Sequence, residues 1–266
     1  MKQSTFENPL PRSRDSDAAA GHEPFDTPVP GRYHVYPEMA AAGLWTTAPD
    51  LARWALAVTR AYNGDTRSVL SPAMARQMIS RQQRQQPPFG DGYWGLGVGV
   101  EGEGDSISFR HGGRDEGFVA NFVMWPKLGR GLFILTNGVS GALVNEVARA
   151  FADMYGLGAA PRTVKRLATV DSAALVALAG RYEFVAPSQR DTLRLEITAA
   201  SNMLRMWDPS LQRVRYLLPE SDGTFFDFDV GSQFTFEHEN SQPAGKVRAL
   251  VLIQGTNRRV APRVSP

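Results

Sequence analysis

The sequence contains no cysteine among its 266 residues. This excludes disulfides, thiolate metal sites and a cysteine nucleophile, and it leaves the redox compartment open. The sequence also lacks any run close to the ~18 consecutive apolar residues that a membrane-spanning helix needs, so we expect no membrane span. A hydrophobic content of 42% instead indicates a globular chain with one large domain or two smaller ones.

The sequence also has only a small excess of positive over negative residues. Lysine and arginine number 29 against 27 aspartate and glutamate residues, and only four of the basic residues are lysines. The basic residues gather in two short groups, at 162–166 and 258–263. A nucleic-acid-binding surface usually concentrates basic residues among aromatic ones, and these groups lack that pattern. We therefore predict no nucleic-acid partner, and we interpret the two groups as a solvated linker and a solvated tail.

Residues 1–38 show no helical or strand periodicity and no signal peptide, and several prolines interrupt them. Two interpretations stay open for this segment. It is a loosely ordered N-terminal arm, or the true beginning of the domain lies upstream of Met1.

Regular structure begins near residue 47. Thr47, with Pro49 and Asp50 behind it, predicts a capped helix that ends at Gly64. Ser71 predicts the start of a second helix, which we expect to bury Met74, Met78 and Ile79. The following pattern predicts antiparallel strands and then an amphipathic helix, at 93–100, 106–110, 118–125, 131–136 and 141–156.

A glycine- and proline-containing linker is predicted at 158–171. It separates a first domain at 1–157 from a small β-rich domain at 172–266. The second domain begins with a short helix at about 172–179, and turn signals then recur every 8 to 12 residues. This spacing predicts a small antiparallel sheet or barrel, with strands at 182–185, 193–198, 203–207, 214–219, 225–230, 233–237 and 247–254.

The most informative stretch of the sequence is 109–118, which contains His111, Gly112 and Gly113. We expect these three residues at the end of a strand, where two glycines let a ligand approach the backbone and the strand amides donate to an anion or a carbonyl oxygen. The alternative is an ordinary structural loop with a histidine in it.

The wider context resembles the C-terminal part of the serine β-lactamase-like hydrolases, a family that joins class C β-lactamases, D-alanyl-D-alanine carboxypeptidases and related esterases. The matching segments occur in family order and at family-like spacing. They are Met1–Phe6, Ala42–Ala52, Tyr93–Gly97, His111–Gly113 with Gly117 and Phe118, and Leu135–Gly138. The segment from residue 180 on resembles the small β-rich domain often appended to these hydrolases.

The resemblance implies a fold and a mechanism. The fold is an α/β (α+β) module of the β-lactamase/transpeptidase type, and the mechanism is hydrolysis of a small-molecule or peptide amide or ester through an acyl-enzyme. His111, at the third-motif position, would orient a substrate carboxylate or support proton transfer. The backbone N–H of Arg114 would be an oxyanion donor, and Gly112 and Gly113 would let the acyl group lie against the strand.

Two of the family's three motifs are absent from the sequence. No serine stands three residues before any lysine, and no tyrosine is followed two places on by asparagine. We therefore expect an incomplete module, the C-terminal portion of a longer hydrolase that is inactive alone because it lacks the nucleophile. A separately encoded N-terminal half is a possible partner. The alternative is a non-catalytic protein of this fold that binds a ligand or a partner.

We expect no metal and no other cofactor. The histidines outside the motif, His22, His34 and His238, have no metal-ligand spacing. The sequence does not choose among β-lactam, D-alanyl peptide and ester substrates. Localisation is also left open, although relatives are often exported to the cell envelope.

Overall fold

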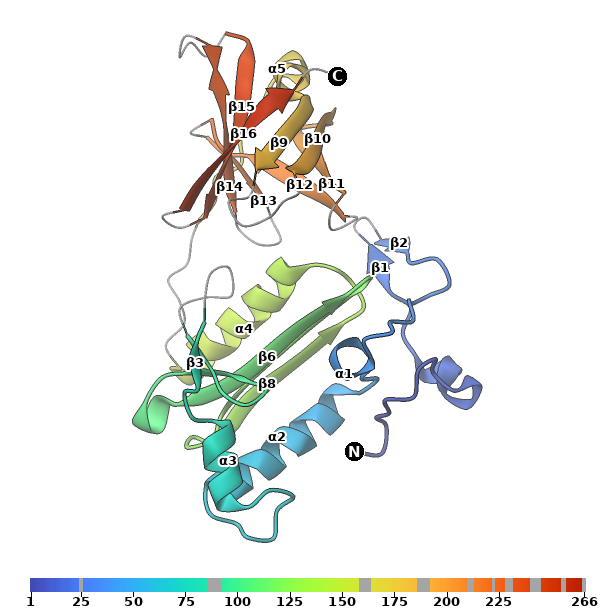
Figure 1. The fold of residues 1–266 in the computed structure, drawn as a ribbon, viewed down its shortest axis with the longest axis vertical. Coiled ribbons are helices and arrows are strands. Elements are labelled where there is room, and N and C mark those ends of the chain that lie inside the picture. The colour runs from blue at the N-terminus through green and yellow to red at the C-terminus, as the bar shows by residue number, and fades with distance from the viewer. Residues whose placement is uncertain are drawn as a thin grey trace. The chain divides into compact units, whose positions relative to one another are not determined.

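A computed structural model describes residues 1–23, 26–85, 92–157, 164–185, 192–209, 213–221, 223–227, 232–239, 245–254 and 257–264. The chain divides into two compact units, Met1–Ala160 and Pro161–Pro266. The first unit combines helices with an antiparallel sheet, and the second is a closed antiparallel barrel (Figure 1). The predicted fold class is therefore confirmed.

The first unit opens with an arm of short elements: η1 (Arg12–Asp17), β1 (His22–Glu23), β2 (Thr27–Pro28) and α1 (Met39–Ala42). Among its described residues before α1, only Gly21 and Val29 are buried. The arm is nevertheless attached. The backbone of Thr5 pairs with that of Trp45, and the buried Asp50 carboxylate accepts hydrogen bonds from the Gln3 N–H at 2.7 Å and the Ser4 hydroxyl at 2.9 Å.

Helices α2 (Ala48–Tyr62) and α3 (Pro72–Met78) begin at the predicted caps. The Thr47 hydroxyl accepts from the Asp50 N–H, and the Ser71 hydroxyl accepts from the Met74 N–H. The prediction that Met74 is buried is wrong, since 48% of it is exposed. Ile79 is buried and Met78 is half-buried, and Ala75, one turn before Ile79, is buried on the same side of the helix.

The sheet is an antiparallel meander whose strands follow sequence order: β3 (Gln83–Arg84), β4 (Tyr93–Trp94), β5 (Gly99–Glu101), β6 (Ser108–Asp115), β7 (Phe118–Trp125) and β8 (Arg130–Thr136). A short 3-10 turn, η3 (Gly104–Ser106), joins β5 to β6. The strand predicted at 93–100 is in fact two strands, because Gly97 has a φ of +72° and the Gly95 N–H bonds back to the Val98 carbonyl. This turn reverses the chain.

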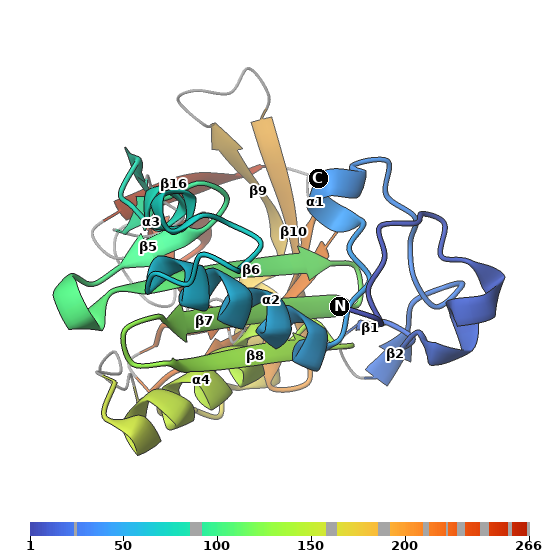
Figure 2. The ribbon, with the colours of Figure 1, turned by 90° about the horizontal axis from the view of Figure 1, so that it is seen from below.

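Helices α2 and α4 (Gly141–Tyr155) cover opposite faces of this sheet (Figure 2). The alternation of side chains along β7 explains the arrangement. Phe122 points to the α2 side, where its ring lies 5.6 Å from that of Trp54. Trp125 points to the α4 side and stacks on Phe151 at 6.4 Å.

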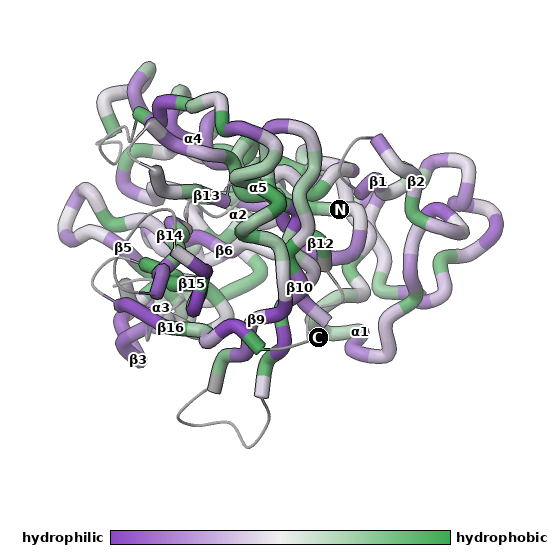
Figure 3. The backbone as a smooth tube through the Cα atoms, turned by 90° about the horizontal axis from the view of Figure 1, so that it is seen from above, coloured by the Kyte–Doolittle hydropathy of each residue, from purple (hydrophilic) through white to green (hydrophobic). Residues whose placement is uncertain are grey.

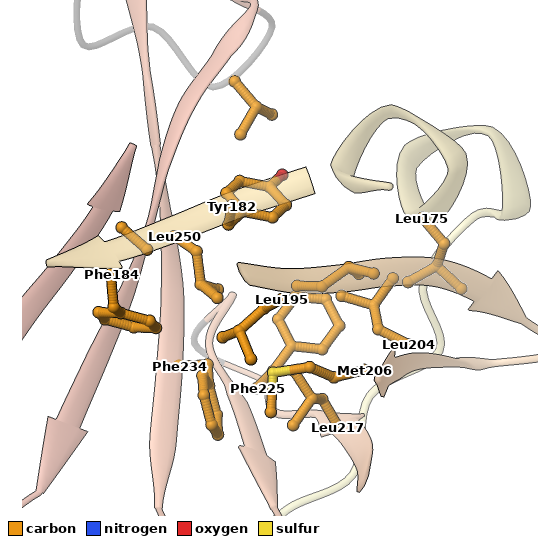
Figure 4. Close-up of a cluster of buried hydrophobic side chains, with 13 residues drawn as sticks. Leu175, Tyr182, Phe184, Leu195, Leu204, Met206, Leu217, Phe225, Phe234 and Leu250 are labelled. Carbon is orange, nitrogen blue, oxygen red and sulfur yellow. The ribbon is translucent and has the colours of Figure 1, made fainter. Parts of the chain in front are cut away.

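The second unit begins with α5 (Ser172–Leu178) and continues with eight strands: β9 (Gly180–Val185), β10 (Thr192–Ala200), β11 (Met203–Asp208), β12 (Arg213–Pro219), β13 (Phe225–Asp227), β14 (Gln233–His238), β15 (Val247–Gln254) and β16 (Asn257–Val264). Neighbouring strands pair in order, and β9 pairs with both β10 and β16. The barrel is filled by side chains, among them Tyr182, Leu217 and Phe234 (Figure 4).

The prediction of a solvated tail at 258–263 is wrong, because β16 occupies it. The strand pairs with β15 along its length and reaches β9 at Arg263 and Val264. Its first residues, 257–259, are hydrophilic (Figure 3) and exposed, while Ala261 is buried in the barrel core. Cross-strand pairing thus decided the structure of a segment whose own composition is that of a tail. Residues 228–230 of the predicted strand 225–230 lie outside the described residues.

The segment before α5 is bonded to the barrel. Leu167 forms a bridge with Glu220, the Ala168 N–H donates to the Pro219 carbonyl, and Lys165 Nζ lies 2.7 Å from Glu220 Oε2. These contacts attach part of the predicted linker 158–171 to the end of β12. The domain boundaries themselves stay predictions, and 158–163 lie outside the described residues.

Candidate functional site

Strand β6 carries the four candidate site residues, His111, Gly112, Gly113 and Arg114. They lie inside the strand and not at its end, which corrects the expectation of a strand that stops at Arg110. The ladder with β7 explains the difference, because it continues in register from Phe109 opposite Met124 to Asp115 opposite Phe118. Backbone pairing therefore keeps the glycines extended despite their low strand propensity.

The two sides of β6 have different neighbours. Strand β7 pairs with it from Phe109 to Asp115, whereas β5 pairs only with Ser108, Phe109 and Arg110. From His111 onward, the ladders of the described strands reach β6 from the β7 side alone. The site residues therefore lie on the part of β6 that β5 does not reach.

The register also sets the direction of the backbone groups on this stretch. Residues in an antiparallel strand alternate between bonding one neighbour and pointing away from it. The Val119 carbonyl accepts from the Thr136 hydroxyl of β8 at 3.0 Å, so it faces away from β6. Val119 is opposite Arg114, and this pair is therefore a non-hydrogen-bonded one. The N–H of Arg114, like that of Gly112, points to the side of β6 away from β7.

Neither site glycine is required by packing. A Cβ added to Gly113 would meet nothing within 4 Å among the described residues, and one on Gly112 would only reach ordinary contact with the Ala120 carbonyl at 3.5 Å. Neither residue has a positive φ. The pair therefore leaves the strand surface without side chains where a ligand would approach the backbone.

His111 is exposed, and its ring lies 6.0 Å from that of Trp94 at an angle of 49°. This contact brings the segment Tyr93–Gly97 to the motif, which the sequence alone could not show. An exposed imidazole beside an aromatic ring is available both to donate a hydrogen bond to an anion and to transfer a proton.

The turn after the site holds the N-terminal arm. Glu116 contacts two residues of the arm: His34 Nδ1 lies 2.6 Å from Glu116 Oε2, and the Glu116 N–H donates to the Tyr36 hydroxyl at 2.9 Å. The His22 N–H donates to the Gly117 carbonyl at 3.2 Å. Partial burial in this region raises the pKa of the Asp115 carboxyl. Sequence analysis missed these arm residues because no spacing pattern relates residues 22–36 to residue 117.

Gly117 has a structural reason to be glycine. Its φ is +78°, and a Cβ there would lie 2.7 Å from the Cα of Gly21 and 2.6 Å from a methyl carbon of Val29. Its neighbour Phe118 contacts the ring of Trp45 at 6.5 Å. The segment Ala42–Ala52 therefore meets Gly117 and Phe118 at this turn, and both of these segments resemble the hydrolases.

The matching segments form one chain of contacts around β6. The segment at 1–6 bonds to 42–52, Trp45 reaches Phe118, and Trp94 reaches His111. The last segment lies on β8, where Leu135 and Thr136 pair with Ala120 and Val119, the residues of β7 that follow Phe118. Nothing in the described parts of the chain forms a group of three His, Asp or Glu residues that could hold a metal. No helix that the structure describes is both long and apolar enough to cross a membrane.

Comparisons with solved structures find similarity to longer proteins. The structure of SurE with D-Leu is 21% identical, with a TM-score of 0.47 over 98% of this chain and 59% of that chain. A penicillin-binding protein homologue from Pyrococcus abyssi, described as octameric, is 18% identical, with a TM-score of 0.47 over 98% of this chain and 56% of that chain. The chain thus spans less than two thirds of either protein. No curated protein matches it.

A family model described as Beta-lactamase matches residues 1–154. This match covers more than half of the chain and includes every segment on which the resemblance rests, from Met1–Phe6 to Leu135–Gly138. The protein therefore belongs to the β-lactamase family.

Proposed function

We propose that this chain forms one wall of an acyl-transfer site in a β-lactamase-related serine hydrolase. The reaction is hydrolysis of an amide or ester through an acyl-enzyme, and the attacking serine comes from polypeptide outside these 266 residues. The observation that carries the proposal is the position of His111, Gly112 and Gly113 on the stretch of β6 that β5 does not reach.

The geometry suits three roles at this wall. The Arg114 N–H, which points away from β7, donates to the oxyanion that develops on the substrate carbonyl. The bare backbone at Gly112 and Gly113 lets the acyl group lie close to the strand. The exposed His111 imidazole holds a substrate carboxylate or moves a proton between nucleophile and leaving group.

The chain by itself is not expected to form an acyl-enzyme. No serine precedes a lysine by three residues, so the usual means of removing the serine proton is missing. Removal of the nucleophile leaves binding contacts but no covalent step. We therefore expect weak recognition of substrate without turnover.

An NMR titration tests the wall directly. The whole ¹⁵N-labelled chain is titrated with benzylpenicillin, a diacyl-lysyl-D-alanyl-D-alanine peptide and p-nitrophenyl acetate. We expect amide shifts centred on Gly112, Gly113 and Arg114, and at least a tenfold weaker response to the two carboxylate ligands in His111→Ala. The matched control is His238→Ala, which alters a histidine of the barrel.

Two outcomes would contradict the proposal. Shifts confined to the barrel would favour a non-catalytic binding protein. A serine of this chain labelled by a fluorophosphonate probe, with hydrolysis of a chromogenic cephalosporin or of the ester, would show that the nucleophile lies within these residues.

A further inference from the structure

The sequence contains two Asn-Gly pairs, Asn63 with Gly64 and Asn137 with Gly138. Such a pair loses ammonia without an enzyme, because glycine has no side chain to keep its backbone nitrogen away from the side-chain carbonyl carbon of the asparagine. The nitrogen attacks that carbon and forms a cyclic imide, and the –NH2 group leaves as ammonia with the proton of the glycine N–H. Water then opens the imide. In a folded chain, the reaction depends on what holds the two nitrogens.

Asn63 is held at the end of α2 in an arrangement that opposes this attack. Its ψ is 3°, and the Gly64 N–H donates to the Ala61 carbonyl at 2.9 Å. The Asn63 side-chain amide donates to the Pro126 carbonyl, in the turn after β7, at 2.8 Å. The attacking nitrogen and the leaving nitrogen are therefore both bonded to groups of the folded sheet unit.

Asn137 lies in a bend after β8, and its surroundings differ. Asn137 is exposed, and none of the described residues accepts a hydrogen bond from the Gly138 N–H. A Cβ added to Gly138 would meet nothing within 4 Å in the described part of the chain. The attacking nitrogen is thus free, which leaves the position of the asparagine side chain to decide the reaction.

The N-terminal arm holds that side chain. The Asn137 side-chain amide donates to the Ala20 carbonyl at 2.9 Å, and its nitrogen lies 3.3 Å from His22 Nδ1. The same imidazole nitrogen lies 3.2 Å from the Asn137 carbonyl oxygen, where β1 comes beside the end of β8 (Figure 2). The leaving nitrogen is therefore bonded to the arm, and we expect reaction after residues 20–22 detach.

The arm is a weaker anchor than α2. Among the described residues before α1, only Gly21 and Val29 are buried, whereas α2 buries five residues. Segments with few buried residues open far more often than helices of the core. Asn137 should therefore be released for reaction much more often than Asn63.

The products oppose return of the arm. Opening of the imide breaks one of its two C–N bonds, which yields aspartate or isoaspartate. Aspartate places a carboxylate oxygen opposite the Ala20 carbonyl, with no proton between the two acceptors. Isoaspartate adds a methylene group to the main chain at the end of β8. A detached arm also loses the bond from the His22 N–H to the Gly117 carbonyl, in the turn after the candidate site.

We propose that Asn137 is a site of spontaneous deamidation controlled by the arm. Detachment of residues 20–22 permits the reaction, and the modified residue keeps the arm from docking again. The chain thus carries a one-way switch that acts on the turn at Gly117. The switch uses water as its co-reactant and needs no serine, so it is independent of the proposed function.

Peptide mapping by mass spectrometry measures the reaction in the whole chain, incubated in mildly alkaline buffer, and enzymatic methylation detects isoaspartate. We expect Asn137 to react at least tenfold faster than Asn63 in the folded chain. In concentrated urea, where neither pair is held, the two rates should be similar. Gly138→Ala should slow the reaction of Asn137 at least tenfold and leave Asn63 unchanged, since the added methyl group hinders the attack and fits the fold.

Two further variants test the role of the arm. Gly117→Ala, which weakens arm docking, should speed the reaction of Asn137 at least threefold, and Gly129→Ala is its matched control. Asn137→Asp should speed hydrogen exchange at the His22 amide at least tenfold, whereas Asn63→Asp should leave it unchanged. Circular dichroism checks that each variant is folded.

Equal rates at Asn63 and Asn137 in the folded chain would overturn the proposed site. A rate at Asn137 that Gly117→Ala leaves unchanged would show that the arm does not control the reaction. Unchanged exchange at His22 in Asn137→Asp would overturn the switch. Absence of the His111 effect on ligand binding would instead contradict only the proposed function.

Discussion

The barrel and the sheet unit differ in whether their strands leave unpaired backbone groups at an edge. Each of the eight barrel strands has two neighbours, so the barrel has no edge strand. The sheet ends at β3 on one side and at β8 on the other. The barrel needs nothing further to cover its backbone, whereas the sheet unit presents an edge.

The hydrophobic cores of the two units also differ in which elements contribute buried side chains. The barrel core draws on every strand and on Leu175 of α5. The sheet core draws on α2, Ile79, Val98 and strands β5 to β7. Strand β8 has no fully buried side chain, and Val144 is the one buried residue of α4. Closure thus places buried residues all around the barrel, and the open sheet leaves its last strand and its last helix partly covered.

The largest expected effect is on the barrel. Tyr182 is fully buried, and its hydroxyl donates to the Leu178 carbonyl at 2.6 Å. Tyr182→Ala should lower the free energy of unfolding of the barrel by about 4 kcal/mol. Tyr182→Phe should cost only about 1 kcal/mol, because it removes the hydrogen bond alone. ¹⁹F-tryptophan NMR during urea unfolding separates Trp207 of the barrel from the four tryptophans of the first unit. An equal shift of all five signals would refute independent unfolding.

The next effect concerns the arm of the sheet unit. Gly117→Ala should weaken the docking of the arm by about 2–3 kcal/mol, since an alanine at positive φ is strained and its Cβ would meet Gly21. Hydrogen exchange at the Gly21 and His22 amides measures the change. Gly129→Ala is the control: its φ is +62° with nothing within 4 Å of the added Cβ, so about 1 kcal/mol is expected. Unchanged exchange in Gly117→Ala would show that the arm is held by other contacts.

Alkaline pH should weaken the barrel through Tyr182, while the raised pKa values of Tyr33 and Tyr36 act in the first unit. Burial raises the pKa of the Tyr182 hydroxyl to about 12, above its value in the unfolded chain. The raised pKa contributes stability that is fully present below about pH 10 and is lost as the pH rises towards 12. We expect a loss on the order of 2 kcal/mol in the barrel over this range. Tyr182→Phe should flatten the dependence of barrel stability on pH. If the variant loses as much stability as the native barrel over this range, groups other than Tyr182 cause the loss.

The smallest effect is a helix cap in the sheet unit. Thr47→Ala removes the hydroxyl that accepts from the Asp50 N–H and should cost about 1 kcal/mol. Urea unfolding followed at Trp54, within α2, measures this change. Thr47→Ser keeps the acceptor and should cost much less. A shift of the Trp207 signal in Thr47→Ala would show that the two units are coupled.

Local signals predicted the elements that depend on local physics. Thr47 and Ser71 start helices because a side-chain oxygen satisfies a free N–H within three residues. The strand at 118–125 was predicted with its exact bounds, because an apolar run interrupted only by Asn121 ends at Pro126. The His-Gly-Gly motif likewise identified the strand that carries the candidate site.

Elements that depend on distant partners were missed or misplaced. The basic segment at 257–264 is a strand only because β15 and β9 pair with it. The extension of β6 through Gly113 depends on β7, and the attachment of the arm depends on a turn about a hundred residues away. No feature within these segments reports on those neighbours.

The sequence by itself determined where the capped helices α2 and α3 begin and where the strand at 118–125 lies, and it showed a resemblance of one histidine and two glycines to the β-lactamase pattern. Tertiary structure alone decided that the barrel closes, that β6 extends past β5 at the motif, and that the arm holds the side chain of Asn137. The reason is the range of the interactions. Caps and side-chain periodicity act within a few residues, whereas closure, register and exposure depend on which distant segments come into contact.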